Sequence, residues 1–189
     1  MAMPAVVPAT IRRWTKSLVQ SLPNDGNRYE LVAGELLVTP SPAERHQGVA
    51  QAVYAAVLEY LRPLGLDLTL YFGPGDISWT RKEIVQPDLF VVAPEDRSHD
   101  WTTFKHLRLV VEVLSPSSRR GDRELKRTLY LRHGVETYWI VDPDSRSVEV
   151  WHPGDAESAT VSDTLTWRVT PDAPELSLDL VALFERVLR

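Results

Sequence analysis

The sequence contains no cysteine. A disulfide framework, a thiolate zinc site and a cysteine nucleophile are therefore excluded. Long apolar runs are missing as well: the run at 109–111 is bounded by Arg108 and Glu112, whereas a helix needs about 20 apolar residues to cross a bilayer. We therefore expect no membrane partner. The first eight residues carry no basic group and include Pro4 and Pro8, so we expect no secretory signal and a cytoplasmic location.

An overall excess of positive charge is also lacking. The chain has 21 Lys and Arg against 26 Asp and Glu, a net charge of −5, which argues against coating by nucleic acid through bulk charge. Residues 119–132 differ from this average because they hold six basic and two acidic side chains. This basic stretch is either a solvated helix face or a surface that follows a phosphate backbone.

The length and composition are those of one globular domain. The 189 residues are 43% hydrophobic and 25% charged, and the 14 prolines do not gather in a linker. We expect a single domain over 1–189, with an N-terminal helical extension at 1–27 and the motifs in 29–142.

The N-terminal third predicts a hairpin followed by a long helix. Strands at 28–32 and 35–39 flank a tight turn at Ala33 and Gly34. A capping box of Ser41, Pro42 and Glu44 predicts the start of the helix. Its apolar side chains recur at helical spacing and end near residue 63: Val49, Val53, Ala56, Val57, Tyr60 and Leu61. A shorter helix is expected around 11–22.

The remainder alternates between strands and helices. Strands are expected at 68–72, 77–80, 84–92 and 107–114, and the last two are apolar enough to be covered on both faces. Asp122 can cap a helix over 123–133, which Gly134 closes. A hairpin over 137–141 and 147–151, a strand at 165–169 and a C-terminal amphipathic helix around 180–187 complete the chain. We therefore predict an α/β fold, a mixed sheet flanked by helices.

Two carboxylates stand inside the apolar strands. Asp88 interrupts 84–92 and Glu112 interrupts 107–114. A buried ionised carboxylate needs a partner. For either acid alone, a structural salt bridge to an Arg and a functional role are about equally expected. If neighbouring strands bring both acids together, the shared partner is a cation. Oxygen ligands favour Mg²⁺ or Mn²⁺, whereas the histidines show no zinc-ligand spacing.

The helix after Glu112 adds a second group of polar residues. Asp122, Lys126 and Tyr130 are spaced i, i+4 and i+8, which places them on one helix face. Lys126 either points at the two carboxylates or extends its ammonium group into water.

The ordered motifs resemble those of the Uma2 family, which is grouped with the PD-(D/E)xK restriction-endonuclease-like nucleases. The resemblance rests on Pro87-Asp88, on the segment 111–116 (VEVLSP), on the helix face just described and on 134–143 (GVETYWIVDP). The segments 34–36 and 41–46 also match. The resemblance implies a restriction-endonuclease-like fold and hydrolysis of DNA phosphodiester bonds by a metal-activated water.

The resemblance also implies residue roles. Asp88, Glu112 and the carbonyl of Val113 would hold the metal, and Glu35 would complete its shell or orient a water. Leu114 stands where the standard signature has Lys, so Lys126 would replace that Lys from the following helix. Further roles are implied for phosphate contact by His46, DNA binding by Arg119, Arg120 and Arg123, and support by Asp122 and Tyr130.

Three functions are compatible with these residues. The first is a Mg²⁺- or Mn²⁺-dependent endonuclease acting on DNA. The second is a catalytically inactive module of the same fold that binds DNA or dimerises, and the third is a hydrolase of small phosphoesters. Because nucleases of this class often pair to cut two strands, the resemblance also implies a homodimer, for which edge strands offer a surface.

Overall fold

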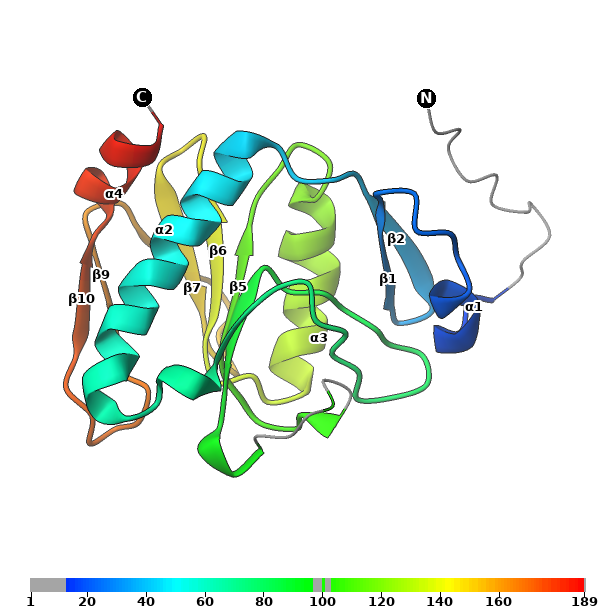
Figure 1. Cartoon of the computed structure of the whole chain (residues 1–189), viewed down its shortest axis with the longest axis horizontal. Helices are drawn as coiled ribbons and strands as arrows, with labels where there is room; N and C mark the ends of the chain where they lie inside the picture. The colour runs from blue at the N-terminus through cyan, green and yellow to red at the C-terminus, as the bar shows by residue number, and fades with distance from the viewer. Residues whose placement is uncertain (1–12, 97–99, 101–102, 189) are drawn as a thin grey trace.

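A mixed six-stranded sheet forms the centre of the molecule (Figure 1). The computed structural model describes residues 13–96, 100 and 103–188. The strand order is β3-β4-β5-β6-β7-β8, with β5 and β6 parallel and the other neighbours antiparallel. The strands are β3 (Leu70–Phe72), β4 (Leu89–Val92), β5 (Leu107–Val113), β6 (Tyr138–Asp142), β7 (Ser147–Trp151) and β8 (Ala159–Val161).

A separate hairpin of β1 (Arg28–Val32) and β2 (Glu35–Thr39) lies beside this sheet, as predicted. Its turn places Ala33 and Gly34 at φ +52° and +89°, conformations that glycine adopts without strain. Leu31 bridges to Ile84 and packs with Tyr29 and with Val19 of α1 (Lys16–Gln20). Tyr29 and Leu31 therefore bury one face of β1, which leaves Arg28 and Glu30 on the other face.

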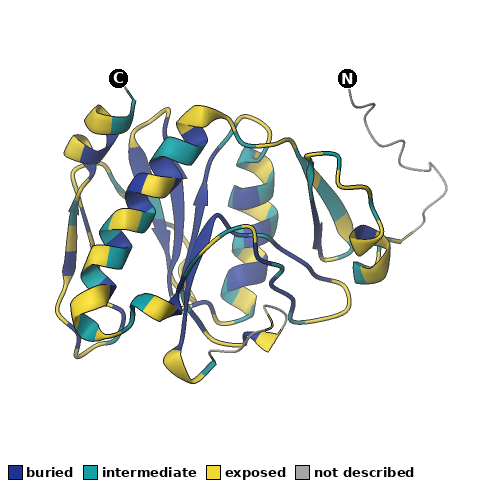
Figure 2. Cartoon of the chain, in the orientation of Figure 1, coloured by how far each residue is buried: buried dark blue, intermediate teal, exposed yellow. Residues whose placement is uncertain are grey.

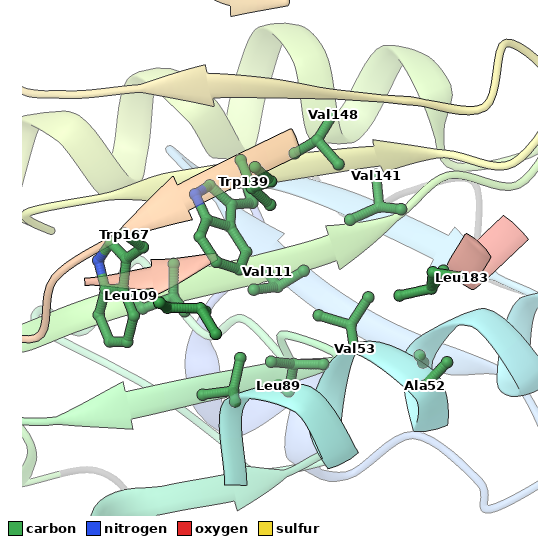
Figure 3. Close-up of a cluster of buried hydrophobic side chains, with 14 of the residues drawn as sticks. Ala52, Val53, Leu89, Leu109, Val111, Trp139, Val141, Val148, Trp167 and Leu183 are labelled. Atoms are coloured by element: carbon green, nitrogen blue, oxygen red, sulfur yellow. The ribbon is translucent and has the colours of Figure 1, made fainter. Parts of the chain in front are cut away.

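One face of the sheet is covered by α2 (Glu44–Leu61), α4 (Leu180–Val187) and the two-stranded sheet of β9 (Thr164–Trp167) and β10 (Leu176–Asp179). Val53 of α2 packs here against Leu89, Val111 and Trp139 (Figure 3). The other face packs against α3 (Arg127–Arg132) through Leu129 and Tyr130. Both faces of β4 and β5 are buried (Figure 2), which confirms the prediction from their apolar sequences.

The alternation of side chains along β5 decides where the site lies. Leu109, Val111 and Val113 face α2, whereas Val110 and Leu114 face α3. Glu112 shares the parity of Val110 and Leu114, so its carboxylate points to the α3 side.

Both helix starts differ from the prediction. Ala43 precedes α2 without a side-chain cap, because the Ser41 hydroxyl donates instead to the carbonyl of Gly26. Asp122 lies inside a π-helical turn, Gly121–Lys126, that runs directly into α3, so it does not cap this helix. No helix among the residues placed by the structure is long and apolar enough to span a bilayer.

Several strand predictions were too long or incomplete. Residues 77–80 contribute a single bridge from Ile77 to Val85, and β4 begins only at Leu89, because residues 84–88 bridge to other segments or line the site. The short strands β8 and β10 were not predicted. The helix expected at 11–22 is limited to α1, and residues 11 and 12 lie outside the described part of the chain.

Candidate active site

Asp88 and Glu112 meet at the start of β4 and the end of β5. The antiparallel register pairs Leu89 with Val111. Asp88 precedes Leu89 and Glu112 follows Val111, so the same register brings the two acids to one place. Both residues are at most 4% exposed. The sequence prediction that neighbouring strands unite these carboxylates therefore agrees with the structure.

Three donors surround the carboxylate of Asp88. Arg28 Nη1 lies 2.7 Å from Oδ1, while His46 Nε2 and the backbone N–H of Val113 lie 3.1 and 2.8 Å from Oδ2. Burial alone would raise the pKa of Asp88, but these donors outweigh it and lower the pKa to about 2. Asp88 is therefore an anion at neutral pH.

Lys126 is the centre of a second cluster of charges. Its Nζ lies 2.8 Å from Glu30 Oε2, 3.1 Å from Asp122 Oδ1 and 3.2 Å from Glu112 Oε1. Burial opposes the ammonium charge, yet the three carboxylates raise the pKa of Lys126 well above its usual value. Lys126 therefore stays protonated although only 5% of its side chain is exposed.

The carboxyl group of Glu112 is held from two sides. Tyr130 donates a 2.8 Å hydrogen bond to the same Oε1 that contacts Lys126. Burial, together with the charges of Asp122, Asp88 and Glu30, raises the pKa of Glu112 well above the ordinary value despite the attraction of Lys126. The site thus holds one carboxyl group that is readily ionised, that of Asp88, and one that retains its proton to higher pH, that of Glu112.

These side chains form the floor of a cavity of about 290 Å³. The mouth is made by two uncharged segments, residues 39–43 between β2 and α2 and residues 115–118 after β5. Four carboxylates line the cavity against the permanent cations Arg28 and Lys126. The cavity therefore carries two negative charges in excess when all four acids are ionised and His46 is neutral.

Glu30, rather than Glu35, is the hairpin acid in this cluster. Glu30 is 1% exposed and accepts from the Gln86 amide at 2.7 Å as well as from Lys126. The exposed Glu35 sits at the turn end of β2 and lines a neighbouring cavity that shares Glu30, Asp122 and Lys126. An acid in a strand whose other face is apolar, the signal that singled out Asp88 and Glu112, would have found Glu30.

The structure brings together most of the other expected site residues. His46 of α2 is buried and contacts Asp88. Asp122 and Tyr130 contact Lys126 and Glu112 respectively. Arg28 was not expected at the site, because its sequence position at the start of a hairpin resembles an ordinary exposed strand end.

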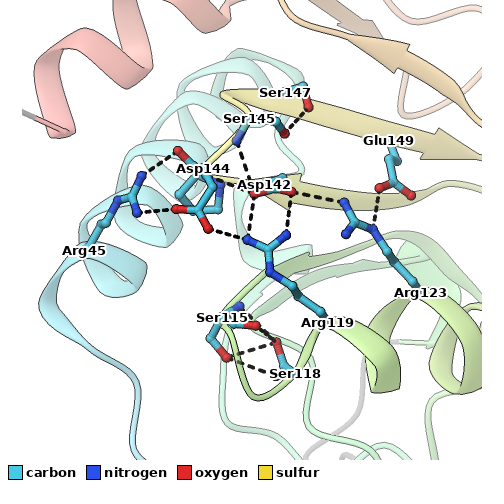
Figure 4. Close-up of polar contacts among 11 residues, drawn as sticks. Arg45, Ser115, Ser118, Arg119, Arg123, Asp142, Asp144, Ser145, Ser147 and Glu149 are labelled. Carbon is cyan, nitrogen blue, oxygen red and sulfur yellow. Dashed lines mark hydrogen bonds and ion pairs between the residues drawn. The ribbon is translucent and has the colours of Figure 1, made fainter.

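The arginines expected to bind DNA have partners within the protein (Figure 4). Arg119 pairs with Asp142 and Asp144, and Arg123 pairs with Asp142 and Glu149. Arg120 is 80% exposed and pairs only with Glu124, one helical turn away. Arg120 is thus the most accessible of the three.

The donor chemistry of the cavity fits a hard divalent cation. Its carboxylate oxygens are the ligands that Mg²⁺ and Mn²⁺ prefer, and the acids outnumber the permanent cations four to two. Asp122 Oδ1 is buried and lies 3.1 Å from Lys126 Nζ. Among the residues that the structure describes, no three His, Asp or Glu side chains are grouped closely enough to hold an ion as they stand.

Comparison with known proteins identifies the fold and the family. A family model described as "Uma2: Putative restriction endonuclease" matches residues 17–181. A solved structure described as a "putative nuclease belonging to DUF820" from Anabaena variabilis ATCC 29413 is similar, with a TM-score of 0.74 and 20% identity. The similarity covers 92% of this chain and 99% of that one. No curated protein matches the sequence.

Proposed function

Because the chain belongs to the Uma2 family, we propose that it is a nuclease that hydrolyses DNA phosphodiester bonds with a divalent metal ion. One observation carries this proposal: three buried carboxylates contact a protonated Lys126 on the floor of a cavity that Asp88 also lines, so acids outnumber permanent cations there four to two. A purely structural cluster would balance its charges, since unpaired buried charge is costly.

Asp88 and Glu112, with the carbonyl of Val113, would hold the ion. A divalent ion held there would supply Lewis-acid chemistry, which would polarise a phosphoryl oxygen and make water a stronger acid. Lys126 would place its positive charge beside the reacting water or the phosphate oxygens, where negative charge develops. Glu30 and Asp122 keep Lys126 charged and fix its direction, because each contacts Nζ.

Two further side chains position the carboxylates. Tyr130 fixes Glu112 through its hydroxyl hydrogen bond, and the π-helical turn presents Asp122 and Lys126 on the same side. His46 holds Asp88 from α2. Arg28 is paired with Asp88 and lines the cavity, so it would compete with an ion for this carboxylate.

Glu112→Gln tests the proposal, with Glu83→Gln as a matched control. Glu83 is equally buried, but it pairs with Arg132 and His133 away from the cavity. We expect calorimetric Mn²⁺ binding in the wild type and in Glu83→Gln, and loss of binding in Glu112→Gln. Mg²⁺- or Mn²⁺-dependent cleavage of plasmid, linear duplex or single-stranded DNA should likewise be retained by the wild type and Glu83→Gln and lost in Glu112→Gln. Cleavage that survives Glu112→Gln would falsify the proposal.

An inactive DNA-binding module is the second candidate, and the engagement of Asp88 favours it. Arg28, His46 and the Val113 amide already donate to both oxygens of Asp88, so an ion would compete with these donors for the carboxylate. This candidate would be supported if the wild type binds DNA but binds no Mn²⁺, whether Mn²⁺ binding is measured in the presence or in the absence of DNA.

A further inference from the structure

The cavity combines a deeply buried charged floor with an uncharged mouth. The side chains of Glu30, Asp88, Glu112, Asp122 and Lys126 are each at most 5% exposed. The mouth consists of Thr, Pro, Ser, Pro and Ala at 39–43 and of Ser, Pro, Ser and Ser at 115–118. A phosphate must therefore pass between two neutral segments before it meets the reacting groups.

Hydrogen bonds within the mouth hold its second segment in place. Ser115 Oγ lies 3.1 Å from the hydroxyls of both Ser117 and Ser118, and the Ser118 hydroxyl accepts from the Ser115 amide at 3.0 Å. The exposed Ser117 stands at the edge of the opening and also lines the neighbouring cavity. The loop is a preformed wall that a substrate must fit.

The size of the cavity limits what can reach the floor. About 290 Å³ is at the lower end of the volumes of small-molecule sites, which is room for a nucleotide-sized group. The reacting groups lie behind the two mouth segments, so a phosphate reaches them only as part of a strand thin enough to pass between residues 39–43 and 115–118.

The basic stretch at 119–132 supplies little unpaired positive charge for a duplex, although Arg120 and Arg132 are more than half exposed. Each of its six basic residues has a partner within the protein, as follows: Arg119 and Arg123 with Asp142, Arg120 with Glu124, Lys126 with Glu112, Arg127 over the Trp151 ring, and Arg132 with Glu83. Duplex binding depends on Lys and Arg that neutralise many phosphates. A substrate of this site is therefore recognised through few phosphates.

We propose that the substrate is single-stranded DNA, or a flap or frayed end, whose backbone threads between residues 39–43 and 115–118, and that intact duplex is excluded. This inference rests on the proposed function, because it takes the cavity floor as the reacting centre. Ser117 is its specificity-determining residue at the opening.

Binding and cleavage of two labelled DNAs test the inference. One is a single strand of 20 nucleotides, and the other is the same sequence in a dumbbell duplex that has no free ends. Binding is measured by fluorescence anisotropy in EDTA and in Ca²⁺, and cleavage is measured in Mn²⁺. We expect at least about tenfold tighter binding of the single strand and a slope of log K against log salt of about −2 or shallower.

Ser117→Glu places a negative charge at the opening, and Ser177→Glu on β10 is the control because Ser177 is equally exposed but remote from the cavity. Ser117→Glu should weaken single-strand binding about fivefold or more, while Ser177→Glu changes it less than about twofold. Equal affinity for strand and dumbbell, efficient dumbbell cleavage, or absence of DNA binding would overturn the inference. Preferential single-strand binding without any cleavage would overturn the proposed nuclease function instead and leave the strand preference standing.

Discussion

Lys126 is the single side chain on which the buried charges depend. Its replacement by Met leaves Glu30, Glu112 and Asp122 without the cation that all three contact. Removal of one partner from a buried charge cluster costs about 3–5 kcal/mol. We expect Lys126→Met to lower the free energy of unfolding by this amount at pH 8, measured by urea denaturation in EDTA.

The effect of Lys126→Met should shrink at low pH, because protonated carboxyl groups no longer need the ammonium group. Lys105→Met is the control, since Lys105 is exposed, and it should change stability by less than about 0.5 kcal/mol. A Lys126→Met protein as stable as the Lys105→Met protein would show that the cluster is already neutralised by protons.

Glu112 predicts a pH dependence of stability. Its pKa in the folded protein lies well above 4.5, chiefly because of burial. The folded state then binds more protons than the unfolded state, so this group lowers stability as pH rises from about 4.5 through the raised pKa. Glu112→Gln in EDTA should therefore match the wild type near pH 4 and become more stable at higher pH. Each unit of pKa shift contributes about 1.4 kcal/mol.

Thermal melts from pH 4 to pH 8 measure this difference, at about 2–4 °C per kcal/mol for a chain of this size. Glu83→Gln serves as the control, because loss of its contacts with Arg132 and His133 should lower the melting temperature. A Glu112→Gln protein that melts below the wild type across this range would contradict the raised pKa.

The sequence exposes some site residues and hides others for physical reasons. Asp88 and Glu112 are detectable because an ionised acid within an apolar strand needs a partner. Glu30 follows the same rule, although the mixed polarity of its hairpin strand makes the signal weaker. Arg28 cannot be found from local pattern, because its partner Asp88 lies 60 residues away. The pairing of Arg119 and Arg123 likewise depends on acids of β6 and β7 that only the fold brings near.

At the scale of elements, the hairpin of β1 and β2 contacts the site through ion pairs on the charged face of β1. Arg28 contacts Asp88 and Glu30 contacts Lys126, while Leu31 supplies the bridge to Ile84. Arg28→Met removes one ion pair between the hairpin and the site, and it also removes a cation that competes with a metal ion for Asp88. We expect faster hydrogen exchange of the β1 amides and tighter Mn²⁺ binding by calorimetry.

Arg62→Met is the matched control, because Arg62 is exposed at the end of α2. It should leave both quantities unchanged. Mn²⁺ binding that weakens in Arg28→Met would mean that Arg28 helps to form the ion site, which is the opposite of competition.

Element types were more predictable than their ends. Periodicity identified α2, β5 and the hairpins, because their buried faces repeat over several turns or residues. The predicted caps were wrong because the Ser41 hydroxyl donates to the distant Gly26 carbonyl and Asp122, inside the π-helical turn, pairs with Lys126. The π-helical turn has no sequence signature, and the three- and four-residue strands β8 and β10 are too short for alternation to be detected.

At the scale of the whole molecule, one sheet joins two hydrophobic cores and the site. The parity of β5 sends Leu109 into the α2 core and Glu112 to the α3 side. The order of strands and helices, together with the apolar sequences of β4 and β5, predicted an α/β fold with both sheet faces covered, whereas the strand order required contacts between distant segments. Because both cores share the strands, we expect them to unfold together.

Leu109→Ala tests this cooperativity. Leu109 is fully buried, and its truncation should cost about 2–5 kcal/mol. If the two cores form one unit, hydrogen exchange under native conditions should accelerate for slow amides of α2 and of α3 by the same factor, although α3 lies on the opposite face. Val181→Ala on α4, where Val181 is 51% exposed, is the control and should leave both helices unchanged. Acceleration confined to α2 would mean that the α3 side, and the carboxylate cluster with it, keeps its structure while the α2 core opens.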